Sequence, residues 1–202
     1  FGISKVVDLE LLNKTRYFIC EMGAYVRGEI RELTRMVPPQ YAILTAIGSQ
    51  HLERFKNLTN TTLAKFELIE AVKPSHALVN WDNPYIKEHL SLPKYHGTLT
   101  YSLSDPQATF YIRSHKLSRS GISFSLAHLG KSFDFDSSLF GTSNLYNLTA
   151  AISMAITLKV PHRTIKDRVA KIVSSPHRLE LKQFGGATLI DNAFSSNEEG
   201  FI

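Results

Sequence analysis

Apolar segments that are typical of strands alternate with amphipathic segments that are typical of helices, and this alternation constrains the fold most. Residues 16–22 and 41–47 are apolar, β-prone runs that each end at a glycine, and both are predicted to be buried strands. Residues 28–37 between them, and residues 60–72 further on, have helical apolar spacing and end before prolines. Residues 77–80 are predicted to be a third strand. This order predicts a mostly parallel sheet that helices cover on both faces.

The pattern changes after residue 97. Apolar and polar residues alternate over 98–101, 108–113, 122–126 and 132–135, and Gly130 marks a turn, which predicts a small antiparallel subsheet. The remaining predicted elements are helices at 143–158 and 164–173 and a strand pair over 179–190 around Gly185 and Gly186. The fold class is therefore α/β, with a mostly parallel sheet flanked by helices and a small antiparallel β subsheet.

Composition excludes several classes of protein. Of the 202 residues 43% are hydrophobic and 20% are charged, which is typical of a folded globular chain rather than a disordered one. No apolar run reaches the ~20 residues of a membrane span, and the single cysteine, Cys20, cannot form an internal disulfide, so we expect a cytoplasmic location. The net charge of +5 comes from scattered basic residues, so no nucleic-acid partner is expected, although anionic nucleotides suit this charge.

Two candidate metal ligands follow predicted strands. Glu21 lies at the end of the first predicted strand, and His51 lies three residues after the glycine that ends the second. Ligands of open α/β sheets bind at the carboxyl ends of strands, so these side chains could converge on one cleft and hold a divalent cation. The alternative is structural: Glu21 pairs with a surface arginine, and His51 caps a loop.

Two cations are further candidates. Lys65 lies early in the predicted helix 60–72 among apolar neighbours, where a neutral amine would be nucleophilic; the alternative is a surface lysine whose apolar stem packs against the helix. Arg178 directly precedes a predicted strand, where its guanidinium could bind phosphate oxygens or simply form a surface ion pair. A G-x-x-x-x-G-K-[ST] phosphate loop does not occur in these residues.

Six sequence blocks occur in a fixed order along the chain. They are E-M-G-A with G-E-I at 21–30, L-T-A-I-G-S-Q-H-L-E at 44–53, A-K-F-E at 64–67, N-W-D-N-P at 80–84, N-L-Y-N-L-T-A-A at 144–151 and P-H-R-L-E at 176–180. Together these blocks resemble the central, ATP-binding domain of the Mur ligase superfamily. Within that family, the first block is most similar to the branch that adds a D-alanyl-D-alanine dipeptide to the peptidoglycan precursor.

The resemblance implies ATP-dependent amide synthesis, in which a substrate carboxylate becomes an acyl phosphate that an incoming amine attacks. It implies that Glu21 holds Mg²⁺ at the nucleotide phosphates and that His51 holds a second Mg²⁺. Lys65 matches a lysine that family members carbamylate with CO2, which turns a cation into an anionic oxygen ligand for the second metal. Glu21, His51 and Lys65 are thus the implied catalytic and metal-binding residues.

The resemblance also implies a nucleotide site. Asn144 and Asn147, three residues apart on one helical face, would contact the adenine edge, and Arg178 would contact the phosphates. Asp191 and Asn192 would lie at the ribose. Asn192 departs from the family pattern, because relatives usually have a second acid at its position.

The resemblance has implications for the domains and partners as well. Residues 1–190 would be a partial central domain, whose phosphate loop precedes Phe1, and residues 191–202 would begin the connection to a C-terminal domain. The expected partners are a UDP-sugar peptide and an amino acid or dipeptide; no oligomeric state is predicted. Alternatively, the protein is a non-catalytic nucleotide-binding or scaffolding remnant of such a ligase.

Overall fold

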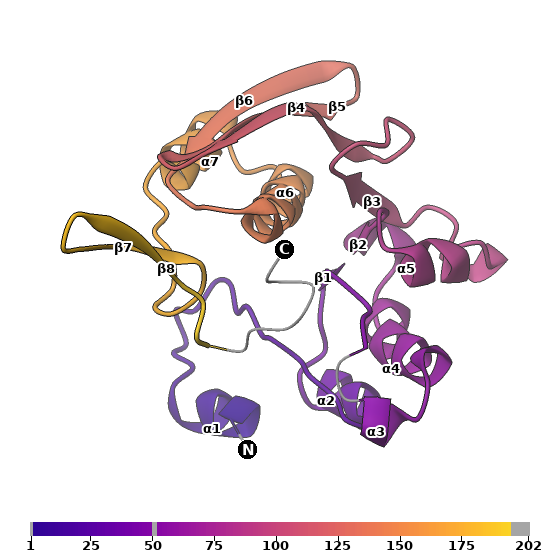
Figure 1. Ribbon diagram of the computed structural model, residues 1–202. Coiled ribbons are helices and arrows are strands. Elements are labelled where there is room, and N and C mark those ends of the chain that lie inside the picture. Colours follow the sequence, from indigo (N-terminus) through magenta and orange to yellow (C-terminus); the bar gives the residue numbers. More distant parts are fainter. Residues whose placement is uncertain (1, 50–51, 195–202) are drawn as a thin grey trace.

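The computed structural model describes residues 2–49 and 52–194, which build a six-stranded sheet, a separate two-stranded sheet and flanking helices (Figure 1). The strands of the main sheet are β1 Ala42–Leu44, β2 Ala77–Asn80, β3 Leu99–Ser102, β4 Phe110–Ser118, β5 Gly121–His128 and β6 Lys131–Ser137, and those of the small sheet are β7 Glu180–Phe184 and β8 Ala187–Asp191. The α-helices are α1 Gly2–Leu9, α2 Glu29–Met36, α3 Leu52–Phe55, α4 Leu58–Glu70, α5 Pro84–His89, α6 Thr142–Thr157 and α7 His162–Val169, and the 3-10 helices are η1 Pro74–His76 and η2 Pro93–Tyr95.

The main sheet has the order β1-β2-β3-β4-β5-β6 and confirms the predicted fold class. Strands β1 to β4 are parallel, and β4, β5 and β6 are antiparallel. Residues 98–101 were predicted to be antiparallel, and this is wrong, because β3 pairs in parallel with both β2 and β4. Gly121, at the β4–β5 turn, has φ 134, and a Cβ there would lie 2.0 Å from the carbonyl oxygen of Ser137, so only glycine fits.

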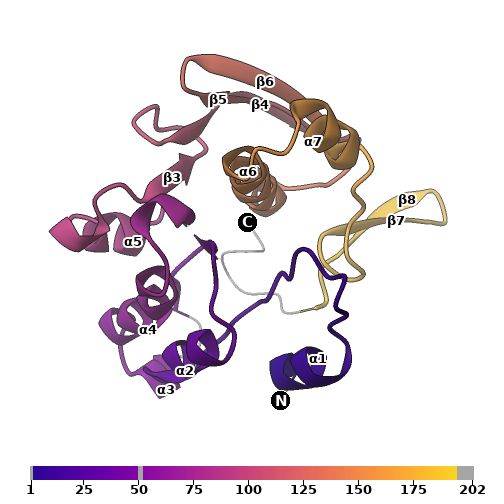
Figure 2. The same cartoon turned by 180° about the vertical axis from the view of Figure 1, so that it is seen from behind.

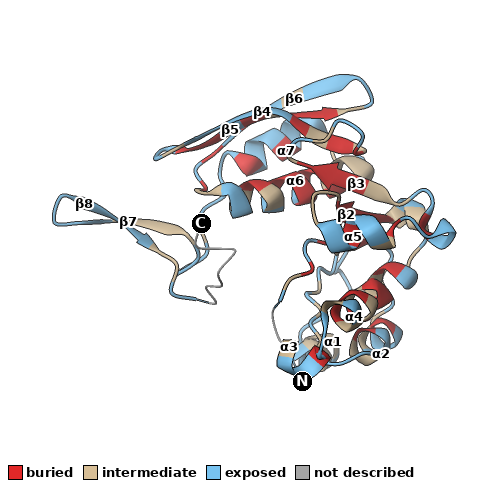
Figure 3. Ribbon diagram, turned by 45° about the vertical axis from the view of Figure 1, so that its right-hand side comes forward, coloured by how far each residue is buried: buried red, intermediate tan, exposed pale blue. Residues whose placement is uncertain are grey.

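Helices cover both faces of the sheet (Figures 1 and 2). On one face Leu78 joins a buried cluster with residues of α6 and α7, and on the other face Ala77 and Val79 join a second cluster with residues of α4 and α5. All four residues of β2 are buried for this reason. Figure 3 shows the buried residues concentrated along the sheet and the helix sides that face it, whereas α1 and the β7–β8 hairpin contain no buried residue.

The strand predicted at residues 16–22 is wrong. This segment has no strand pairing, and Tyr17 and Ile19 are 74% and 95% exposed. A strand is stabilised by backbone pairing and by burial of its side chains against neighbours. On the other side of β1 from β2, the described residues contain no further strand, so the apolar composition of this segment alone does not produce one.

The helix predicted at 60–72 is confirmed as α4, although it begins earlier. Its N-cap is Asn57, whose side chain accepts a hydrogen bond from the backbone N–H of Asn60 over 2.8 Å, so the predicted N-cap, Asn60, lies inside the helix. Buried residues occur on several sides of α4, as the sequence predicts. None of the described helices has the length and apolar character that a membrane crossing requires.

Candidate functional site

Side chains from two other parts of the chain hold the loop that follows β1. The backbone carbonyl oxygens of three consecutive residues, 45–47, each accept one side-chain hydrogen bond. The donors lie on α4, at the carboxyl end of β2 and at the start of α5. Asn80 Nδ2 donates to Thr45 O, Lys65 Nζ to Ala46 O and Asn83 Nδ2 to Ile47 O, each over 2.9 Å.

Lys65 thereby lies at the carboxyl end of a parallel strand, where ligands of α/β sheets bind. Its neighbours Ala64 and Phe66 are buried, which anchors this turn of α4 against the sheet, while Lys65 itself is half-buried. The Lys65 amine therefore has a defined position at the end of β1.

Two carboxylates shape the loop before α2. Buried Glu67 accepts hydrogen bonds from the backbone N–H groups of Gly28, over 2.8 Å, and Arg31, over 3.0 Å, so it caps the N-terminus of α2 from a neighbouring helix. Glu29 accepts from the backbone N–H groups of residues 25 and 26, and these bonds lower its pKa. The loop between the E-M-G-A block and α2 is thus fixed by hydrogen bonds to carboxylates.

Asp82 connects the turn after β2 to α6. Its carboxylate accepts from Ser102 Oγ over 2.5 Å, from the Leu103 backbone N–H over 2.7 Å and from Tyr146 Oη over 3.0 Å. Burial, and then the negative charge of Asp82, raise the pKa of Tyr146 to about 12, so this phenol stays a donor at neutral pH. Asp82 therefore fixes α6 relative to the ends of β2 and β3.

The two asparagines predicted to contact adenine have different environments on α6. Asn144 is half-buried, and its Nδ2 donates over 2.8 Å to the carbonyl oxygen of Phe140, which lies just before the start of α6. Asn147 is exposed, while its neighbours Leu145 and Leu148 are buried against the sheet. Asn147 is thus on the side of α6 that solvent reaches.

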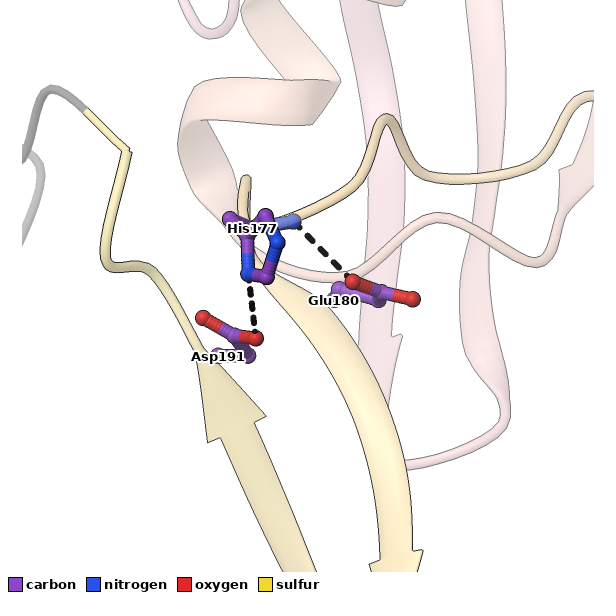
Figure 4. A group of neighbouring side chains, drawn as sticks. All are labelled: His177, Glu180 and Asp191. Carbon is purple, nitrogen blue, oxygen red and sulfur yellow. Dashed lines mark hydrogen bonds and ion pairs between the residues drawn. The ribbon is translucent and has the colours of Figure 1, made fainter.

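The P-H-R-L-E segment forms an ion-pair network with the end of β8 (Figure 4). His177 Nδ1 and Lys182 Nζ lie 2.8 and 2.5 Å from the Asp191 carboxylate, and the His177 backbone N–H donates to Glu180 over 3.0 Å. Lys182, and then His177, lower the pKa of Asp191 to about 2. The ligand atoms of His177, Glu180 and Asp191 are close enough for a metal ion, but Lys182 Nζ pairs with both carboxylates. The network is therefore explained without a metal.

This network presents Arg178 to solvent. His177 and Leu179 on either side of it have left-handed φ values of 60 and 48. The turn is held because the Leu179 N–H donates to Asn192 Oδ1 over 3.3 Å and the Phe194 N–H donates to the His177 carbonyl oxygen over 3.1 Å. The exposed guanidinium of Arg178 lies 4.9 Å from the centre of the Phe194 ring.

The structure brings only part of the predicted site together. Glu21 is exposed on the extended segment before α2, and His51 lies outside the described residues, so its convergence with Glu21 and Lys65 stays a prediction. Lys65 lies at the end of β1. The predicted nucleotide-binding residues that share one hydrogen-bonded unit are Arg178, Asp191 and Asn192.

Four residues that organise this region were not predicted to have a role, and these are Glu67, Asn80, Asp82 and Asn83. The signal was present for three of them, because N-W-D-N begins at the last residue of a predicted strand and asparagine and aspartate commonly bind nearby backbone groups. Glu67 belongs to the A-K-F-E block, but its partners in the loop before α2 are 36 to 39 positions away, so no local pattern reveals its capping role.

The parallel strands and the covering helices define the chain as an α/β domain, a class of protein in which ligands bind outside the carboxyl ends of the strands. Residues 2–155 match the Mur ligase middle domain, so the chain belongs to this family.

Two proteins of similar sequence are ligases that act on UDP-N-acetylmuramoyl compounds. The chain is 25% identical to the UDP-N-acetylmuramoyl-tripeptide–D-alanyl-D-alanine ligase of Buchnera aphidicola, with 96% of this chain and 43% of that protein aligned. It is 29% identical to the UDP-N-acetylmuramate–L-alanine ligase of Lactobacillus acidophilus, with 90% of this chain and 39% of that protein aligned. The chain therefore spans about two fifths of the length of these relatives.

Solved structures show the same fold. MurF from Acinetobacter baumannii superposes with a TM-score of 0.83 at 25% identity, over 94% of this chain and 41% of that chain. MurF from Thermotoga maritima, solved in complex with ADP, superposes with a TM-score of 0.77 at 23% identity, over 90% of this chain and 42% of that chain.

Proposed function

We propose that this chain is the nucleotide- and metal-binding part of an ATP-dependent ligase of peptidoglycan precursor synthesis. The ligase would join an amino acid or D-alanyl-D-alanine to a UDP-N-acetylmuramoyl peptide through an acyl phosphate. The observation that carries the proposal is the position of Lys65, the lysine of the A-K-F-E block, at the carboxyl end of β1. The relatives named for these reactions support the substrate class.

The donor set fits Mg²⁺ in part. Mg²⁺ prefers oxygen ligands, and the exposed carboxylate of Glu21 supplies them. We assign the second metal to His51, from its place in the sequence, and to a carbamate on Lys65. The Lys65 carbamate would form when the neutral amine attacks CO2 and releases one proton. An anionic oxygen that can bind a metal ion would then stand in place of an ammonium group that cannot. Bound Mg²⁺ would neutralise the charge that develops on the phosphates.

The nucleotide contacts are assigned to the sheet edge and to the hairpin. Exposed Arg178 is available for phosphate oxygens, and exposed Asn147 for the adenine edge. One Nδ2–H of Asn144 donates to the Phe140 carbonyl oxygen, so this side chain would contact adenine through Oδ1 or the second Nδ2–H. Asp191 and Asn192, assigned to the ribose, also hold the turn that presents Arg178, so they would act on the nucleotide partly through that arginine.

The extent and location of the domain are part of the proposal. We assign residues 1–190 to the central ATP-binding domain and residues 191–202 to the connection to a C-terminal domain. The cytoplasm is the proposed compartment, supported by the single cysteine of the chain.

The test uses the protein that carries this chain, with ATP, Mg²⁺, a UDP-N-acetylmuramoyl tripeptide and D-alanyl-D-alanine, or UDP-N-acetylmuramate and L-alanine. Amide formation with stoichiometric ADP release is expected, and Lys65→Ala should abolish it. The matched control is Lys73→Ala, because Lys73 is an exposed lysine just after the C-terminal end of α4 and should be dispensable for activity.

Two results would contradict the proposal. Normal turnover by the Lys65→Ala protein would remove the carbamate role. A wild-type protein that binds Mg-nucleotide but forms no ADP with any of these substrates would be a non-catalytic remnant of a ligase.

A further inference from the structure

Asn80 and Asn83 each use both ends of the side-chain amide. Asn80 Oδ1 accepts from the Asp82 backbone N–H over 3.0 Å, and Asn83 Oδ1 accepts from the Ile86 N–H over 3.2 Å as the N-cap of α5. Both oxygens therefore organise the local turn, while both Nδ2 groups donate across to the loop after β1. An asparagine amide supplies both an acceptor and a donor, whereas an aspartate carboxylate has no donor and a serine hydroxyl is too short to reach the loop.

The hydrogen bonds that Asn80 and Asn83 donate to the loop after β1 lie on either side of the one that Lys65 donates. The carbonyl oxygens of residues 45–47 take their donors in the order Asn80, Lys65, Asn83. Residues 45 and 46 are exposed, so burial does not hold this backbone, whereas the side chain of Ile47 is buried in the core. The position of the Ala46 carbonyl oxygen therefore depends on the hydrogen bonds on either side of it.

We propose that Asn80 and Asn83 are positioning residues for Lys65: they clamp the backbone of residues 45–47 so that the Ala46 carbonyl holds the Lys65 amine at the end of β1. This inference rests on the proposed function in giving Lys65 its role. Neither asparagine is required to touch the substrate or a metal. They act through the backbone that Lys65 contacts.

Serine substitutions separate the two uses of the amide. In Asn80→Ser and Asn83→Ser, a hydroxyl can still accept from the local N–H, as serine does at N-caps, but it is too short to donate to Thr45 or Ile47. The matched control is Asn57→Ser, because Asn57 caps α4 through Oδ1 and donates to no loop among the described residues. Asn80→Asp and Asn83→Asp provide a second, isosteric pair that keeps the acceptor and loses the donor.

The first readout is backbone hydrogen exchange in the protein that carries this chain. A peptide that covers residues 42–49 should exchange about 10-fold faster in the Asn80 and Asn83 variants, the effect of leaving a carbonyl without its donor, with α6 unchanged. Asn57→Ser should leave this peptide as in the wild type. If both the serine and the aspartate variants exchange at the wild-type rate, the clamp does not exist.

The second readout is the bicarbonate concentration that gives half-maximal ligase activity. It should rise several-fold in Asn80→Ser and Asn83→Ser and not in Asn57→Ser, because a displaced Lys65 amine is carbamylated less readily. Faster exchange with an unchanged bicarbonate requirement would overturn the positioning role. Full activity of Lys65→Ala would instead remove the role of Lys65 on which this inference rests. The exchange measurement distinguishes that result from failure of the clamp, because it needs no turnover.

Discussion

Single acidic side chains in this protein connect segments that are far apart in the sequence. Glu67 joins α4 to the start of α2, Asp82 joins the end of β2 to α6, and Asp191 joins β8 to the P-H-R-L-E turn. Each carboxylate accepts from at least two donors, so its loss leaves several groups without partners.

Lys182 should control the ionisation of Asp191. In Lys182→Met the largest cause of the lowered pKa is removed, so the pKa of Asp191 should rise from about 2 toward the ordinary value of about 3.9. Because the folded value lies below the unfolded one, Asp191 stabilises the fold above pH ~4, and this contribution is lost as the pH falls toward 2.

An NMR titration of the Asp191 carboxyl carbon measures this pKa directly. Lys182→Arg keeps a cation and should retain a low value, and Lys171→Met changes an exposed lysine elsewhere and should have no effect. An Asp191 midpoint that stays near 2 in Lys182→Met would show that the ion pair is not its cause.

Among the elements, α4 contacts the most parts of the candidate site. Its buried residues Phe66 and Ile69 pack against β1 and β2, Lys65 binds the loop after β1, and Glu67 caps α2. A shift of this one helix would move both loops that approach the sheet edge.

Removing the Glu67 carboxylate should therefore destabilise the protein. In Glu67→Ala the backbone N–H groups of Gly28 and Arg31 lose their acceptor inside a partly buried contact, which costs about 1–3 kcal/mol of unfolding free energy. Urea unfolding measures this loss. Glu32→Ala, an exposed change in the first turn of α2, should stay within about 0.5 kcal/mol, and equal losses in the two variants would contradict the capping role.

The sequence predicts elements whose signal is local. The helix after Gly28 and the strand at residues 77–80 are found because their apolar spacing and breakers lie within the element itself. The segment 16–22 is mispredicted because strand formation needs a neighbouring strand, and the direction of β3 is mispredicted because pairing partners are not encoded in its four residues.

The same distinction applies to the site. Lys65 and Arg178 are found from residue type and motif, but the bonds that position them come from partners elsewhere in the chain. The clamp of Asn80 and Asn83 on the loop after β1 spans more than 30 positions, so no spacing rule reveals it.

At the scale of the whole molecule, one sheet separates two hydrophobic clusters and belongs to both. Among the described residues, β1 and β2 contribute side chains both to the cluster of α6 and α7 and to the cluster of α4 and α5, which lie on opposite faces of the sheet (Figures 1 and 3). The candidate site draws on both sides, because Lys65 comes from α4 and Tyr146, held by Asp82, comes from α6. We therefore expect the two clusters to unfold as one unit.

Leu78→Ala tests that coupling. Leu78 is fully buried in the α6 cluster, so its truncation should cost about 2–5 kcal/mol, while Leu129→Ala, at a residue that is 84% exposed, should cost no more than about 0.5 kcal/mol. Native-state hydrogen exchange should show the most protected amides of α4 and α6 losing the same protection, because both helices open only when the shared sheet unfolds. Loss of protection in α6 alone would show that the two faces are separate cooperative units, and the site would then be held on one side at a time.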